Sequence, residues 1–165
     1  MKKLIPLISI SIVLFFASCA ECDKEFNVAD ETIAIEHLLE NWIIANETQD
    51  FDLIEKIWAP ESDIILYGTD SHERLMGWTN IRSAIKSQFS QIDETYISAS
   101  DLFIKINCTG STAWFAENIS YNFMYNGEAN KFEGLRFTGV VEKMEGEWKL
   151  VQAHLSVPAS VGVGN

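Results

Sequence analysis

The end of the chain constrains its fold most, because it holds two strand-like runs joined by a tight turn. The runs span residues 135–143 and 147–157, with Glu145-Gly146 between them. Both faces of the second run are mainly apolar, and one face carries Gln152 and His154 in its second half. A strand that is covered on both faces, with polar groups on one of them, is typical of a pocket wall.

The rest of the chain predicts three helices and further strands. Asp30 is expected to cap a helix over 31–48, because Ile35, Leu38, Leu39, Trp42 and Ala45 recur at helical spacing. Asp50 is expected to cap a short helix over 51–58, and Thr79 a third helix. Strands are expected over 63–67, 73–76, 95–106, 112–125, 131–143 and 147–157.

The turns between the late strands indicate hairpins. Asn126-Gly127 and Glu145-Gly146 are residue pairs that suit two-residue hairpin loops. Helices segregated onto one face of an antiparallel sheet make an α+β domain. We expect this domain to span residues 30–158, with a tail over 159–165.

The first residues predict export. Two lysines precede an apolar run over 4–16, which is too short for a comfortable membrane span, and Ala17-Ser18-Cys19 follows. This layout resembles a bacterial lipoprotein signal over 1–18, which implies cleavage before Cys19, its acylation, and a tether over 19–29. Ala20 follows the cysteine in place of the Asp that favours inner-membrane retention, so we expect an envelope protein anchored in the outer membrane. The alternative is an ordinary secretory signal with an incidental cysteine.

Charge and cysteine content exclude some classes of partner. The formal net charge is −12, and removal of two lysines with the signal makes it −14. Nucleic acid is a poor partner for such a chain, because phosphates are bound through clustered Lys and Arg. No metal-ligand spacing is present and no cofactor is expected, while a bridge between Cys22 and Cys108 stays open.

Three segments together resemble a known family. They are NETQDFDLIEKIWAPESDIILYGTD over 46–70, Gly77-Trp78 ahead of NIRSAIKSQF, and RFTGVVEKMEGEWKLVQAHLSVP over 136–158. Their order and spacing resemble the SnoaL-like domain of the nuclear transport factor two-like superfamily. The resemblance implies a curved antiparallel sheet that wraps a long N-terminal helix into a cone, with a pocket inside. It also implies an outer sheet face that often mediates dimerisation, so we expect a homodimer.

The ketosteroid isomerase branch of that superfamily offers a residue-by-residue test. Its oxyanion tyrosine falls on Trp42, its catalytic aspartate near Ile65 or Leu66, and its second aspartate near Gly139. Proton transfer needs a carboxylate near the substrate carbon and a hydrogen-bond donor near its oxygen. We therefore do not expect that isomerase reaction.

The register of the last hairpin selects the polar pocket residues. A bare two-residue turn would place Gln152 opposite Gly139 and His154 opposite Phe137. A three-residue loop over 144–146 would place Gln152 opposite Thr138 and His154 opposite Arg136. We favour the second register, because it gathers the polar groups on one face. The preceding hairpin then adds Glu117 and Tyr121 to that face.

Each candidate has a functional and a structural interpretation. His154 could be a general acid or base, or a core histidine, and Arg136 could hold a ligand carboxylate or pair with Glu117. Trp42 and Tyr67 could line the pocket or belong to the core. The predicted pocket comprises Trp42, Tyr67, Glu117, Tyr121, Arg136, Thr138, Gln152 and His154.

Three functions fit these expectations. The first is an envelope-anchored protein that binds a small, mostly apolar molecule. The second is an isomerase, cyclase or hydrolase that uses His154. The third is a dimerisation or assembly module without a ligand.

Overall fold

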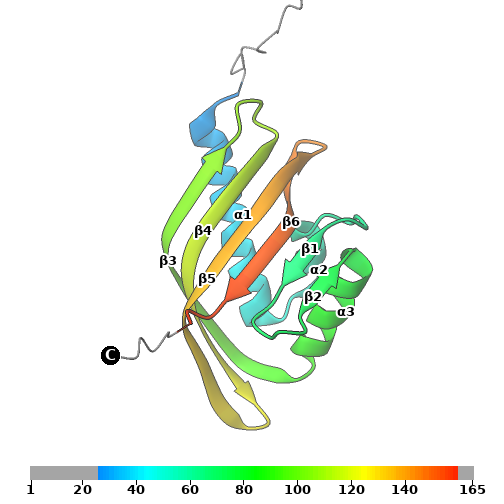
Figure 1. Cartoon of the computed structure of the whole chain (residues 1–165), viewed down its shortest axis with the longest axis vertical. Helices are drawn as coiled ribbons and strands as arrows, with labels where there is room; N and C mark the ends of the chain where they lie inside the picture. The colour runs from blue at the N-terminus through cyan, green and yellow to red at the C-terminus, as the bar shows by residue number, and fades with distance from the viewer. Residues whose placement is uncertain (1–25, 160–165) are drawn as a thin grey trace, which may run out of the picture.

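Residues 26–159 are described by the structure, a computed structural model, and they form three helices packed against one curved sheet (Figure 1). The helices are α1 (Val28–Thr48), α2 (Phe51–Ile57) and α3 (Trp78–Phe89). The strands are β1 (Ile65–Tyr67), β2 (Arg74–Met76), β3 (Ile92–Ile106), β4 (Thr112–Tyr125), β5 (Glu128–Met144) and β6 (Glu147–Ser156).

The sheet order places the helices inside a curve. The six strands run in the order β2-β1-β6-β5-β4-β3, and the long strands bend around α1, with α3 beside the short strands (Figure 1). The predicted α+β architecture is confirmed. One detail differs, because β1 pairs with β6 in parallel, whereas every other pair in this sheet is antiparallel.

Two expectations concern residues outside the described part of the chain. The lipoprotein signal, Cys19 and most of the tether precede Phe26, and most of the tail follows Ala159. Within 26–159, no helix has both the length and the apolar character needed to cross a membrane. Cys108 is disulfide-bonded, and the other two cysteines of the chain, Cys19 and Cys22, lie outside the described range.

Capping decides where the helices begin. Asn27 caps α1, because its side chain accepts a hydrogen bond from the backbone N–H of Ala29 at 3.0 Å, so the helix starts before the predicted cap, Asp30. Asp50 caps α2 as predicted. The prediction that Thr79 caps α3 is wrong, because Gly77 occupies the N-cap with φ 76° and provides no side-chain bond.

Polar contacts fix both ends of α1 on the sheet. Near its start, Glu31 accepts hydrogen bonds from Lys143 Nζ at 2.6 Å and from Trp148 Nε1 at 2.8 Å. The bond from Lys143 is the main reason that the pKa of Glu31 is lowered. Near its end, Glu47 accepts a bond from the backbone N–H of Ile97 at 2.7 Å. The predicted apolar stripe of α1 lies between these two ends of the helix and is buried.

Two β-bulges determine which side chains face α1. Between β4 and β5 the register shifts between Ile119 and Tyr121, opposite a β5 segment in which Gly134 has φ 63°. Between β5 and β6 it shifts between Val140 and Val141. Each bulge adds one residue to one strand, so the side chains beyond it change face relative to an unbroken alternation.

Candidate functional site

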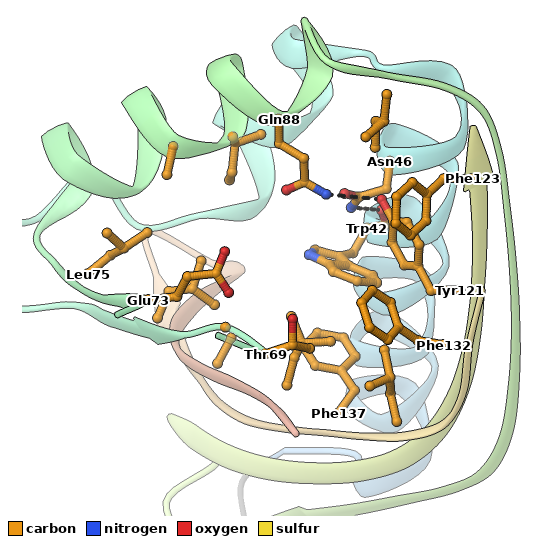
Figure 2. A pocket seen from close by; sticks show the side chains of 18 of the residues that line it. Trp42, Asn46, Thr69, Glu73, Leu75, Gln88, Tyr121, Phe123, Phe132 and Phe137 are labelled. Carbon is orange, nitrogen blue, oxygen red and sulfur yellow. Dashed lines mark hydrogen bonds between the residues drawn. The ribbon is translucent and has the colours of Figure 1, made fainter. Parts of the chain in front are cut away.

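The main cavity lies inside the curve of the sheet, between α1, α3 and the loop that joins β1 to β2. Its volume is about 460 Å³. Figure 2 shows α3 on one side of this space and the aromatic side chains of α1, β4 and β5 on the other. The lining residues are Trp42, Asn46, Trp58, Leu66, Gly68, Thr69, Glu73, Leu75, Ala84, Ile85, Ser87, Gln88, Gln91, Ile92, Tyr121, Phe123, Phe132, Leu135, Phe137, Ala153 and Leu155.

Aromatic rings form one wall of the cavity. The rings of Trp42 and Phe137 have centroids 4.4 Å apart. Tyr121 and Phe123 meet edge to face at 5.7 Å, and Phe123 stacks on Phe132 at 5.9 Å. These separations are typical of favourable aromatic pairs, so the wall is a packed apolar surface.

Three polar side chains meet at the end of the cavity near α3 (Figure 2). Gln88 Nε2 donates to the hydroxyl of Tyr121 at 3.2 Å, and Asn46 Nδ2 donates to the carbonyl of Trp42 at 2.7 Å. Burial raises the pKa of Tyr121 to about 12. The phenol is neutral near pH 7, as an ordinary tyrosine is, and its hydroxyl can both donate and accept a hydrogen bond.

Two tryptophan side chains line the cavity and each carries an indole N–H group. Trp58 is 1% exposed and its Nε1 has no hydrogen-bond partner within the described residues. Figure 2 shows the indole nitrogen of Trp42 directed toward the open space. A buried donor without a partner is costly. Of the two indole N–H groups, that of Trp42 is the one directed at space that an acceptor on a bound molecule could occupy.

The loop between β1 and β2 forms the rim. Glu73 Oε2 accepts a hydrogen bond from the backbone N–H of Asp70 at 3.0 Å, and the Glu73 carbonyl accepts one from the N–H of Gly68 at 2.9 Å. Glu73 is the only carboxylate among the described residues that line the cavity, and none of them is Lys, Arg or His.

The predicted polar group exists, but it lies on the outer face of the sheet. Arg136, Thr138, Gln152 and His154 do share a face, as predicted. Their predicted pairing is wrong, because Met144 pairs with Glu147 across a two-residue turn and the bulge then shifts the register. Thr138 pairs with His154, Val140 with Gln152, and Arg136 with Ser156. The same strands present Leu135, Phe137, Ala153 and Leu155 to the cavity.

Tyr67 belongs to that outer face too. It pairs with His154 across the parallel strands, and their rings meet edge to face with centroids 5.8 Å apart. The neighbouring Leu66 lines the cavity instead. Both His154 and Tyr67 are exposed.

Glu117 and Arg136 lie on opposite faces, so the predicted pair is not formed. Glu117 pairs with Phe137 in register, and Arg136 pairs with Asn118. The physical reason is the bulge near Gly134, which adds one residue to β5. Glu117 was expected on the same face as Arg136, and this extra residue places it on the opposite face. Of the eight predicted pocket residues, Trp42 and Tyr121 line the main cavity.

Several lining residues had not been anticipated. They are Asn46, Glu73, Gln88, Phe123 and Phe132, among others. Asn46 and Gln88 had a weak signal, because each follows an apolar stripe residue, Trp42 and Ala84, by four positions on its helix. The Glu73 loop and the bulged segment at Phe132 had none, since their positions depend on tertiary packing.

A family model decides the relationship. The model of the SnoaL-like domain matches residues 35–160, which is most of the chain.

The chain belongs to the SnoaL-like domain family.

Solved structures share the fold of this SnoaL-like domain. A nuclear transport factor 2-like superfamily protein from Salmonella enterica has a TM-score of 0.75 at 16% identity, over 84% of this chain and 99% of that one. A candidate scytalone dehydratase from Novosphingobium aromaticivorans has a TM-score of 0.71 at 13% identity, over 83% and 90%.

A third structural neighbour is named as an association domain. A candidate calcium/calmodulin-dependent protein kinase II association domain from Xanthomonas campestris has a TM-score of 0.66 at 20% identity, over 82% of this chain and 91% of that one. No curated protein matches the sequence. At these identities the neighbours establish the fold alone, and their names describe an enzyme in one case and an assembly module in another.

Proposed function

We propose that this SnoaL-like domain binds a small, mostly apolar, uncharged molecule in its cone-shaped cavity. The observation that carries the proposal is a cavity of about 460 Å³ with an aromatic wall. Small-molecule sites are typically 300–1,000 Å³, lined mainly by apolar and aromatic side chains with a few polar groups. This cavity has that size and that composition.

The polar end of the cavity suggests the orientation of the ligand. Gln88, Tyr121 and Asn46 supply neutral donors and acceptors there, and no cationic side chain is among the described lining residues. A carboxylate ligand would therefore be desolvated without a counter-charge. We expect a hydroxyl or carbonyl oxygen at that end and an apolar ring system against Trp42 and Phe137.

The experiment is native mass spectrometry of the protein purified gently from its natural host. A retained small molecule is the expected result. The variant Ala84→Phe adds a ring to the cavity lining, and Ala34→Phe adds the same ring at an exposed site on α1. We expect the first to lose the molecule and the second to keep it. Equal retention by both variants, or an empty protein that also shows no thermal shift with sterols and polyketide-like compounds, would contradict the proposal.

We propose further that Cys19 carries the lipid that anchors this domain in the outer membrane of a bacterial envelope. The support is the sequence pattern alone: a basic start, a short apolar run, and Ala17-Ser18-Cys19 followed by Ala20. Mass spectrometry of the N-terminal peptide should show acyl groups on Cys19, and Cys19→Ser should release the protein from the membrane fraction. An unmodified Cys19 would exclude the anchor.

The outer sheet face supports a proposal of homodimerisation. Phe103 is 56% exposed on β3 and Trp114 is 47% exposed on the adjacent β4, where Trp114 pairs with Val140 of β5. Exposed apolar groups that cluster on a sheet face are typical of interfaces. Light scattering should show a dimer that Phe103→Glu converts to a monomer. A monomeric wild-type protein would rule the dimer out.

The position of His154 bears on the enzyme alternative. Its ring lies on the outer face beside Tyr67, whereas the cavity opens on the inner face. A general base must reach the proton that it abstracts. We therefore favour binding over a reaction that uses His154.

A further inference from the structure

A second cavity lies on a different side of α1, and it shares no lining residue with the first. Its volume is about 270 Å³, a little below the usual range for small-molecule sites. It is an open cavity between α1, β3 and β4. The lining residues are Glu36, Leu39, Glu40, Ile43, Ala99, Ser100, Asp101, Leu102 and Glu117.

Glu117 is the buried polar group of this cavity. It is 6% exposed, and its Oε1 has no hydrogen-bond partner within the described residues. On β4 it lies between Ala116, which pairs with Phe103, and Asn118, which pairs with Ser100. Two residues of β3 therefore stand opposite Glu117, in a bulge where Asp101 has φ 57°. The bulge opens the space that the carboxylate lines.

The titratable side chains around this cavity are all acidic. From α1, Glu36 and Glu40 face it, and from β3, Asp101 does. Asp101 is partly satisfied, because its Oδ2 accepts from Asn118 Nδ2 at 3.0 Å. None of the described lining residues is Lys, Arg or His. Glu117 is therefore a desolvated carboxyl group among acids, and burial raises its pKa to about 7.

The arrangement distinguishes between kinds of cation. Within residues 26–159, no group of three or more His, Cys, Asp or Glu side chains is placed to hold a metal ion. A divalent ion needs several oxygen ligands at close range. An organic ammonium group can instead donate to one carboxylate while its carbon chain contacts Leu39, Ile43 and Leu102.

We propose that this second cavity binds a small alkylammonium cation, with its ammonium group on Glu117 and its apolar chain against Leu39, Ile43 and Leu102. The buried carboxylate gains the counter-charge and hydrogen bond that it otherwise lacks. Glu36 and Glu40 at the cavity edge add a field that attracts the cation.

The test is titration of the full chain with n-butylammonium chloride, followed by NMR and calorimetry at about pH 8. We expect saturable binding that exceeds the binding of n-butanol, its neutral counterpart. Glu117→Gln should weaken binding at least tenfold, because it removes the charge and keeps the shape. Glu128→Gln, at the exposed tip of the β4–β5 hairpin, should bind as the wild type does.

The pH dependence gives an independent readout. Binding to the wild type should weaken as the pH falls from about 8 to about 6, because a proton competes for Glu117. Glu117→Gln should lose this dependence. Leu102→Trp leaves every carboxylate in place and adds bulk to the cavity lining, so it should also weaken binding. Thermal melting verifies that each variant is folded.

Three results would overturn the proposal: no saturable binding at millimolar butylammonium, equal affinity for butanol, or unchanged affinity in Glu117→Gln. The test is separate from the function proposed for the main cavity. Ala84→Phe, which fills that cavity, should leave butylammonium binding unchanged.

Discussion

The replacement of Glu117 by Gln should change how the stability of the protein depends on pH. Burial raises the pKa of Glu117 from 4.5 to about 7 in the folded state. The folded protein therefore binds this proton more tightly than the unfolded chain does. The resulting contribution to stability is fully present below about pH 4.5 and is lost as the pH rises through about 7.

The magnitude follows from the difference between the two pKa values. At 1.36 kcal/mol per pH unit, moving from 4.5 to about 7 corresponds to about 3 kcal/mol as an upper bound. Glu117 lines an open cavity, and solvent screening lowers the expected effect to about 2 kcal/mol. For a domain of this size, that equals roughly 4–8 °C in Tm.

The assay is urea unfolding of the wild type and Glu117→Gln across about pH 5 to 9. The informative quantity is the difference in unfolding free energy between the two proteins, because other titrating groups largely cancel. We expect the variant to gain about 2 kcal/mol relative to the wild type as the pH rises. Glu128→Gln, an exposed control, should show no such gain. Parallel curves for the wild type and Glu117→Gln would refute the reasoning.

Three further changes test the packing. Gly139→Ala should lower the free energy of unfolding by about 1–3 kcal/mol, because the added Cβ would lie 2.5 Å from the carbonyl oxygen of Gln152. An unchanged midpoint in urea unfolding would contradict this expectation. Trp42→Ala should cost about 3–5 kcal/mol through lost contact with Phe137, and a loss under 1 kcal/mol would show that the ring is not core. Reduction of the Cys108 disulfide should lower stability by about 2–5 kcal/mol, whereas equal Tm with and without reductant would show that the bond contributes nothing.

The two cavities use different faces of one helix. Trp42 and Asn46 face the main cavity, while Leu39 and Ile43 face the second cavity. The bonds from Lys143 and Trp148 to Glu31 hold the start of α1 on the β5–β6 hairpin. The two cavities share no lining residue, so their occupants can be tested separately.

Local patterns in the sequence were sufficient for the elements and their order. The strand predicted over 112–125 has the observed bounds, and the turns at Asn126-Gly127 and Glu145-Gly146 form with positive φ at all four residues. The apolar stripe of α1 has a clear period, and Asp50 caps α2 as expected. These features depend on backbone preferences and side-chain spacing within a few residues, which the sequence contains directly.

Tertiary structure decided which face of each strand meets the cavity. Alternation has a period of two, so one extra residue reverses every position beyond it. The bulge near Gly134 places Glu117 on the inner face with Phe137, and the bulge near Val151 places His154 on the outer face with Thr138. Both faces of β6 carry apolar residues, so its sequence alone does not say which face packs against α1. Packing against α1 and the neighbouring strands selects the register, and through it the residues available for binding.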